Sequence, residues 1–414
     1  MVICNKIRPQ LIILCIAFFF SAASSALEAN LSNFTINGFG TLGLIKSTDK
    51  ELGFRETISQ QGVFDEYNFS RNSDVGIQAN YYATDKLDFG LQFLAKERYK
   101  NSLDKTIQSA YINYHITSKI NLRLGRVSAG SYMMSDYMHV GFTQLWTHLP
   151  TEFYGAHPVT AIDGLDLVFR QSLFDGFFST KLWFGRTNYD IYGKEPSDVN
   201  LEQMLGASVA WENDIWHFKV AHSQIKASVK NNTITSLEQS FQAASLAGWP
   251  EAANFTDLLS DDSIIRYYSA AVTYDNADWL IQSELGLVNS DWLLNPSKVS
   301  GYLSVGRKLG SVTPFIMGGW SEAQDRRFII PTPSVGAYIP LQQFSQYIFN
   351  QNYTAQHTLS VGARWDVQPK IALKIQWDKT WTDQYGNKLF DKLSGAVAEK
   401  RQLDTFSISV DFLF

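Results

Sequence analysis

The sequence predicts an all-β protein, a transmembrane antiparallel β-barrel of about sixteen strands. Three observations predict this fold: an alternating closing segment, a cysteine-free chain behind an export leader, and a regular succession of short turns and long loops. The closing segment, residues 406–414, reads FSISVDFLF, so apolar residues alternate with Ser407, Ser409 and Asp411. Because the side chains of a strand point alternately to its two faces, this segment has one apolar and one polar face.

The first residues have the order of a secretory signal peptide. Lys6 and Arg8 precede an apolar run over residues 11–20, and small residues follow as far as Ala26. The run is too short to cross about 30 Å of hydrocarbon as a helix. We therefore expect a cleaved signal peptide over residues 1–26 and a barrel domain over residues 27–414.

Composition narrows the class of protein. Cys4 and Cys15 both lie in the leader, so we expect neither disulfides nor thiolate metal sites in the exported chain. The formal charge of the whole chain is −5, and the absence of a basic run argues against nucleic-acid binding. Beyond the leader no apolar run reaches the roughly 18 residues that a transmembrane helix needs. An aromatic content of 14% at average hydropathy fits a wall that is apolar outside and polar inside.

Short polar turns divide the chain into hairpins. Their Asp, Asn, Gly and Pro residues suit the backbone angles of tight reversals. The seven turns are residues 84–86, 117–119, 174–176, 212–214, 275–278, 308–310 and 368–370. Each lies between two alternating segments, and aromatic residues gather beside the turns, as they do at a membrane–water interface.

Longer polar segments separate the hairpins. They are predicted near residues 47–66, 96–106, 126–163, 187–203, 224–263, 288–299, 321–356 and 378–404. Eight long loops and seven short turns give sixteen strands, from residues 34–45 to the closing segment. This even count, with short turns at one end, is typical of a barrel whose sheet has no free edge. The facing of the strand over residues 312–320 stays open, because Pro314 and two glycines blur its alternation.

Two loops have features of their own. Residues 236–244 in the fifth loop are helix-like, with Leu237 and Phe241 four residues apart on one face. The seventh loop carries three prolines and several aromatic residues. For both loops we expect a solvated segment, with a cap over the mouth, a subunit contact or a surface partner as alternatives.

Three segments resemble those of Gram-negative general or substrate-selective outer-membrane porins. They are the NLRLGR segment at 121–126, the hairpin from GARWD at 362–366 to ALKIQW at 372–377, and the closing FSISVDFLF. The resemblance implies that the third loop, residues 126–163, folds into the barrel and narrows it. It also implies an outer-membrane location, an assembly signal at Phe414 and a homotrimer.

Candidate pore residues follow from this layout. At the constriction we expect Arg123, Arg126, Asp136, Tyr137, Glu152 and Tyr154. Charges on inward strand positions are Arg170, Lys181, Lys219, Glu284, Arg364 and Lys374. Such charges set ion preference in a pore. The alternatives are that residues 126–163 form an ordinary surface loop, and that basic and acidic side chains of neighbouring strands neutralise one another.

The function expected is passive diffusion of small hydrophilic solutes or ions through a water-filled channel. The alternative is a non-conducting barrel that acts as an adhesin or a membrane-embedded enzyme. No motif fixes a catalytic nucleophile, and His139, His148 and His157 lack metal-ligand spacing, so we expect no enzyme, cofactor or metal. Expected partners are outer-membrane lipid and lipopolysaccharide, small hydrophilic solutes, and the barrel assembly machinery.

Overall fold

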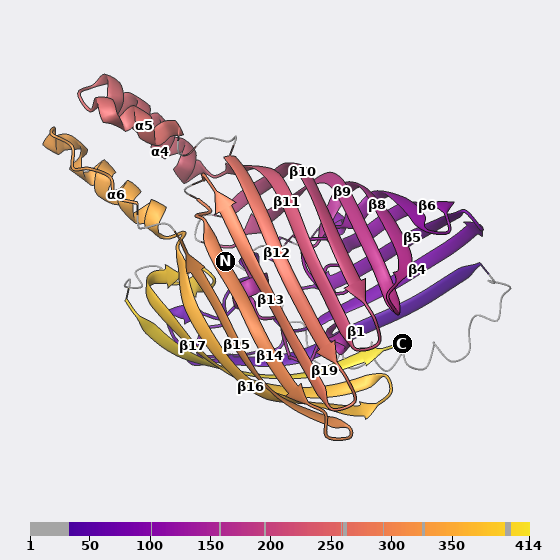
Figure 1. The fold of residues 1–414 in the computed structure, drawn as a ribbon. Coiled ribbons are helices and arrows are strands. Elements are labelled where there is room, and N and C mark those ends of the chain that lie inside the picture. Colours follow the sequence, from indigo (N-terminus) through magenta and orange to yellow (C-terminus); the bar gives the residue numbers. More distant parts are fainter. Residues whose placement is uncertain are drawn as a thin grey trace, which may run out of the picture.

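The structure is a computed structural model that describes residues 33–414, apart from 101, 157–158, 194–195, 258, 260–262, 293, 325–327 and 394–398. The predicted signal peptide lies outside the described residues. The fold is a closed antiparallel β-barrel whose wall consists of sixteen long strands (Figure 1). This confirms the predicted fold class and strand number. No helix among the described residues is long and apolar enough to cross a membrane.

The sixteen wall strands follow one another around the barrel. They are β1 (Phe34–Ser47), β4 (Asp74–Thr84), β5 (Leu87–Lys96), β6 (Ile107–Thr117), β7 (Ile120–Ser128), β8 (Ala161–Leu173), β9 (Gly176–Ile191), β10 (Ser197–Glu212), β11 (Trp216–Lys230), β12 (Ser263–Asp275), β13 (Trp279–Ser290), β14 (Lys298–Arg307), β15 (Val312–Ala323), β16 (Thr354–Gln368), β17 (Ile371–Asn387) and β19 (Arg401–Leu413). The sheet closes because β1 pairs with β4 on one side and with β19 on the other. Two-residue strands β2 (Leu52–Gly53), β3 (Tyr67–Asn68) and β18 (Asp391–Lys392) lie in the loops at its mouth.

All seven predicted turns join consecutive wall strands, whereas several loop boundaries were wrong. β9 and β10 continue to Ile191 and from Ser197, so the fourth loop is much shorter than residues 187–203. β17 continues to Asn387, well into the predicted loop 378–404. These strand ends extend beyond the apolar part of the wall, so both of their faces are polar. Without alternation of apolar and polar residues, the sequence does not reveal a strand there.

Exposure alternates along the strands in the sense expected for a membrane barrel. On β19, Phe406 and Ile408 are about half exposed, whereas Ser407 and Ser409 are buried. The apolar side chains therefore face outward to lipid and the polar side chains face inward, as in other barrels of this kind. β15 shows why its facing could not be predicted. Its inward residues Phe315 and Met317 are apolar and buried, because they belong to one cluster with residues of a loop inside the barrel, and the Phe315 ring also lies over Gly362.

Helices project from the loop end of the barrel (Figure 1). α4 (Asn232–Leu246) confirms the predicted helix, and Leu237 and Phe241 are buried on its inner face. It packs with η2 (Pro250–Ala252) and α5 (Ala253–Asp257). α6 (Ile339–Asn350), preceded by η3 (Gly336–Tyr338), lies in the seventh loop, where we expected an irregular solvated segment. Its Phe349 belongs to the same buried cluster as Phe241, so the two loops share a small core of their own.

Candidate functional site

The loop between β7 and β8, residues 129–160, packs against the inner side of the wall. It contains η1 (Gly141–Thr143) and α3 (Thr151–Tyr154). The largest hydrophobic cluster joins this loop to inward residues of the strands. Its loop members include Tyr132, Met133, Met134, Leu145, Trp146, Phe153 and Tyr154, and its wall members include Trp183, Tyr267, Tyr302, Phe315 and Met317. The inner face of the sheet is apolar here because the loop covers it and removes its side chains from water.

Glu284 on β13 binds the loop near both of its ends. Its carboxylate accepts hydrogen bonds from the backbone N–H of Met133 at 2.9 Å, from the hydroxyl of Tyr302 at 2.9 Å and from the hydroxyl of Tyr154. Lys219 on β11 donates to the carbonyl of Tyr132. Glu284 is 1% exposed, so these donors replace the water that an ionised carboxylate requires.

Basic residues of the opposite wall hold the tip of the loop. Lys374 Nζ on β17 donates to the carbonyls of Gly141 at 2.7 Å and Trp146 at 2.9 Å. Arg364 on β16 donates to the carbonyls of Phe142 and Gln144, and its side chain also contacts Asp366. Backbone carbonyls at a loop tip would otherwise be buried without donors. Of the charges that we expected to meet solutes, Lys219, Glu284, Arg364 and Lys374 are therefore engaged with the loop.

The returning half of the loop is held by neutral and acidic wall residues. Thr147 hydrogen-bonds Gln376 and Ser407, and the indole of Trp146 donates to Ser304 at 2.9 Å. Glu152 is 2% exposed and accepts hydrogen bonds from Gln356 and Thr358 on β16. Hydrogen bonds thus run from this loop to β11, β13, β14, β16, β17 and β19.

The predicted residues Arg123, Lys181 and Asp136 form a charge cluster beside the start of the loop. Arg123 Nε lies 2.8 Å from Asp166 Oδ1, and Lys181 Nζ lies 3.3 Å from Asp166 Oδ2. Asp136 lies 3.4 Å from Lys181 Nζ and hydrogen-bonds Ser128. Neighbouring strands do neutralise one another here, which was the alternative considered from the sequence.

The remaining predicted residues lie apart from this cluster. Arg126 belongs to β7, not to the loop, and alternates to the side of exposed Leu124; it forms ion pairs with Asp163 and Asp104. Arg170 shares the inward alternation of Asp166 but is exposed near a turn. Tyr137 is half-buried against the main cluster. Arg126 and Tyr154 nevertheless line the cavity described below, whereas Arg170 is not among the residues that line it.

Arg55 ties the neighbouring loops together above this segment. The side chain is 6% exposed and donates to the carbonyls of Ile58, Tyr192, Lys388 and Leu389. These acceptors come from the β1–β4, β9–β10 and β17–β19 loops. Ile58 N–H donates in turn to the carbonyl of Gly155, so the first and third loops are in direct contact.

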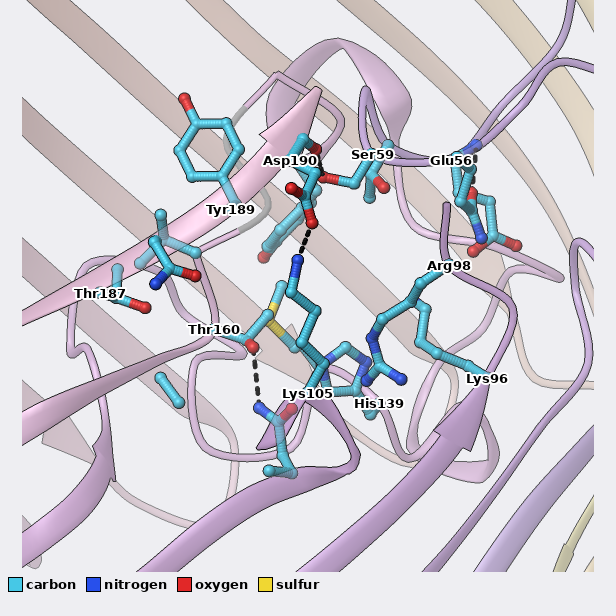
Figure 2. A pocket seen from close by; sticks show the side chains of 18 of the residues that line it. Glu56, Ser59, Lys96, Arg98, Lys105, His139, Thr160, Thr187, Tyr189 and Asp190 are labelled. Carbon is cyan, nitrogen blue, oxygen red and sulfur yellow. Dashed lines mark hydrogen bonds and ion pairs between the residues drawn. The ribbon is translucent and has the colours of Figure 1, made fainter. Parts of the chain in front are cut away.

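A cavity of about 890 Å³ remains between these loops and the strands β1 and β4 to β10. Figure 2 shows Lys96, Arg98, Lys105 and His139 on one side of it and Glu56 and Asp190 toward the other. Lys105 contacts Asp190, and Gln108 donates to Thr160 at 2.8 Å. The lining is rich in charged and polar side chains, which suits water and hydrophilic solutes.

The cations of this cavity differ in how they are neutralised. Lys100 and Lys105 contact Asp190. In the part of the chain that the structure describes, Lys96 and Arg98 form no ion pair within 4 Å, and Arg98 donates only to the carbonyl of Leu94.

The acids and the imidazole beside them also have unsatisfied atoms. Glu56 Oε1, Asp74 Oδ1 and His139 Nε2 lack hydrogen-bond partners within the described ranges of the chain. Burial raises the pKa of Glu56 against the opposing charges of Lys96, His148 and Arg71. Burial, together with Lys96 and Arg98, lowers the pKa of His139. A neutral imidazole thus lies beside two unpaired cations.

The sequence analysis missed most of this lining. Glu56, Asp74, Lys96 and Arg98 were not singled out, although Asp74 and Lys96 end the two strands of one hairpin and pair directly in register. That register was available from the turn at 84–86 and was the signal that could have found them. Within the described residues no group of three or more His, Cys, Asp or Glu side chains could hold a metal ion.

His148 gives a pH-dependent anchor. Its Nε2 lies 3.0 Å from Asp378 Oδ2. Burial lowers the pKa of His148, but the Asp378 carboxylate and Glu56 outweigh burial and raise it to about 9. Because this folded-state pKa exceeds the ordinary value of 6.5, the stabilisation is complete below about pH 6.5 and is lost as pH rises through 9.

Between pH 7 and pH 10 we expect the free energy of unfolding of the unaltered protein to fall by about 2 kcal/mol more than that of His148→Gln. Urea unfolding of both proteins at several pH values measures this. Parallel pH curves for the two proteins would contradict the assignment of a charged His148.

The chain has the fold of the Gram-negative outer-membrane porins. Over 92% of its length it superposes on an anion-selective porin from Comamonas acidovorans, with a TM-score of 0.53, 10% identity and 99% of that chain covered. The outer-membrane channel DcaP of Acinetobacter baumannii gives a TM-score of 0.52 at 11% identity, covering 92% of this chain and 97% of that one. OmpF of Salmonella typhi, in complex with daunomycin, gives 0.51 at 11% identity, covering 93% and 99%. No protein-family model and no curated protein matches the sequence significantly.

Proposed function

We propose that the protein is an outer-membrane channel for the passive diffusion of small hydrophilic solutes or ions. One observation carries the proposal: a charged, polar cavity persists inside a closed barrel whose outer face is apolar. A wall of this kind is suited to a membrane outside and to water inside. The fold shared with the porins is consistent with such a role.

In this proposal the 129–160 loop narrows the lumen from the side of β11 to β19, and solutes pass along the opposite side. A sixteen-stranded barrel is wide enough for an aqueous channel unless a segment enters it. Lys96 and Arg98 are then the charges that a solute meets, while Lys374, Arg364 and Glu284 position the loop.

Planar-bilayer recording of the purified protein tests this proposal. We expect stable ohmic conductance steps in KCl. Glutamine substitution of both Lys96 and Arg98 should move the reversal potential in a salt gradient toward cation preference, because fixed positive charge favours anions in a pore. Lys100→Gln, which removes a cation already neutralised by Asp190 and Asp198, is the matched control and should change the potential less.

A folded barrel without conductance would instead favour the alternative, an adhesin or a membrane-embedded enzyme. If the channel conducts but its reversal potential is the same with and without the charges of Lys96 and Arg98, solutes follow another path. A homotrimer and an assembly role for Phe414 are further proposals. Cross-linking in native membranes tests the first, and the insertion efficiency of Phe414→Ala tests the second.

A further inference from the structure

Four basic residues gather at the loop end of the barrel, and none of them is among the residues that line the cavity of Figure 2. They are Arg55, Lys298, Lys388 and Lys392, called here the mouth cluster. Arg55 Nη2 donates to the carbonyl of Lys388 at 2.9 Å. Lys388 repels both Lys298 and Lys392, and Arg55 repels Lys392, so all four charges lie within electrostatic range of a neighbour.

Among the described residues, none of these four charges has a counter-ion in direct contact. The hydrogen bonds of Arg55 all go to backbone carbonyls, and Lys388 Nζ donates to the carbonyl of Leu294 at 3.1 Å. Within the described residues no member forms an ion pair within 4 Å. Asp391 attracts Arg55 at longer range, but its Oδ2 accepts a hydrogen bond from the backbone N–H of Gly62.

Lys298 is the most informative member. It is the first residue of β14 and shares the inward alternation of buried Ser300 and Tyr302. The side chain is only 4% exposed, yet it has neither an acceptor nor a counter-ion in the described part of the chain. Nearby in the sequence, the buried indole N–H of Trp292 also lacks an acceptor among the described residues. A largely buried lysine without a counter-ion is unfavourable, so an arrangement of this kind is stabilised when an anion completes it.

We propose that the mouth cluster binds a small multivalent oxyanion, specifically a phosphate group carried by a solute. Several converging cations suit the charge and the oxygen acceptors of phosphate, which accepts charge-assisted hydrogen bonds from both Lys and Arg. Burial lowers the pKa of Lys388 to about 8, with repulsion from Arg55 and Lys392 adding to it. A bound anion reverses this effect by favouring the charged lysine. A role of the cluster as an entry site for phosphate-bearing solutes rests on the proposed channel function. Phosphate binding by the cluster does not depend on that function.

Calorimetric titration of the folded barrel in neutral detergent with inorganic pyrophosphate, at constant ionic strength, tests the proposal. We expect saturable binding that weakens about tenfold or more in Lys298→Met and in Lys388→Met. Lys100→Met, which removes a cation paired with Asp190 and Asp198, should bind as the unaltered protein does. Without pyrophosphate, Lys298→Met should be at least as stable to urea as the unaltered protein, because it removes an uncompensated buried charge.

A second arm replaces pyrophosphate with dihexanoyl phosphatidic acid, which carries the same group on a lipid. Binding of the lipid alone would overturn the assignment to a soluble solute. Equal pyrophosphate affinity in all variants, or none in any, would overturn the site. The conductance in KCl remains a separate test of the channel. A barrel that binds pyrophosphate through Lys298 but does not conduct would support the binding site and refute the channel function.

Discussion

Deletion of residues 135–148 is expected to raise the single-channel conductance at least about twofold, because an unobstructed sixteen-stranded barrel encloses a wide aqueous lumen. The deleted stretch carries Trp146, which is fully buried against Tyr302, and the carbonyls that bind Lys374 and Arg364. Its removal takes side-chain volume out of the lumen and leaves the sixteen strands and their pairings untouched.

A matched deletion separates the effect of the lumen from that of the loops in general. Residues 236–243 of α4 contribute Leu237 and Phe241 to a different buried cluster, in the projecting helices, and their removal should leave conductance near that of the intact channel. The heat-modifiable migration of a folded barrel in gel electrophoresis shows that each deletion variant has closed. If the first deletion folds and its conductance is unchanged, the 129–160 loop does not limit the pore.

The strand pattern was predictable because it depends on local periodicity. Each wall strand has to present apolar side chains to lipid and polar ones inward, so residues such as Ile408 and Ser409 reveal their faces within a few positions. The turns were predictable for the same reason, since Asp, Asn and Gly at a reversal act through their own backbone. Where the strands are polar on both faces, as at the end of β9, the pattern is lost and the loop boundaries were wrong.

The roles of the inward charges were not predictable in the same way. Glu284 binds the N–H of Met133, 151 positions earlier in the sequence, and no local pattern records that distance. Alternation identifies Glu284 as inward without distinguishing a side chain that meets solutes from one that anchors a loop. The sequence does not reveal either that a charge such as Lys96 lacks an ion pair, because its ion-pair partners depend on every other loop that enters the lumen.

One sequence signal did point to the buried loop. The inward residues of β15, Phe315 and Met317, are apolar, whereas their register neighbours are glycines for Phe315 and Ser304 and Ser360 for Met317. An apolar inward residue in a water-filled barrel is unfavourable unless protein covers it. The blurred alternation of residues 312–320 therefore reflects packing against the 129–160 loop as well as the proline and glycines.

Lys374→Met is expected to be the most destabilising single substitution in the barrel wall, with a loss of about 3 kcal/mol or more, because it leaves a buried carboxylate without its counter-ion. Lys374 Nζ lies 3.0 Å from Asp411 Oδ2, and both side chains are at most 1% exposed. Thr41 on β1 donates to the other oxygen of Asp411 at 2.6 Å. The pair thus joins β17, β19 and β1 where the barrel closes.

The same substitution should loosen the constriction, because Lys374 also holds the carbonyl of Gly141. Gly141 approaches so closely that a Cβ there would lie 2.2 Å from Asp411 Oδ1, so the loop tip and the closing strand form one packed unit. Urea unfolding measures the stability, and open-channel current noise reports the loop. Lys370→Met, at an exposed turn, is the control and should change neither.

Combining Lys374→Met with Asp411→Asn separates the charge effect from the loss of packing. The double variant has no unpaired buried charge, so it should recover much of the stability while the current stays noisy, since the loop carbonyls still lack their donor. A double variant as unstable as Lys374→Met alone would mean that the lysine acts through its packing. A single variant as stable as the unaltered barrel would mean that water reaches Asp411 and that the closing strand does not depend on this pair.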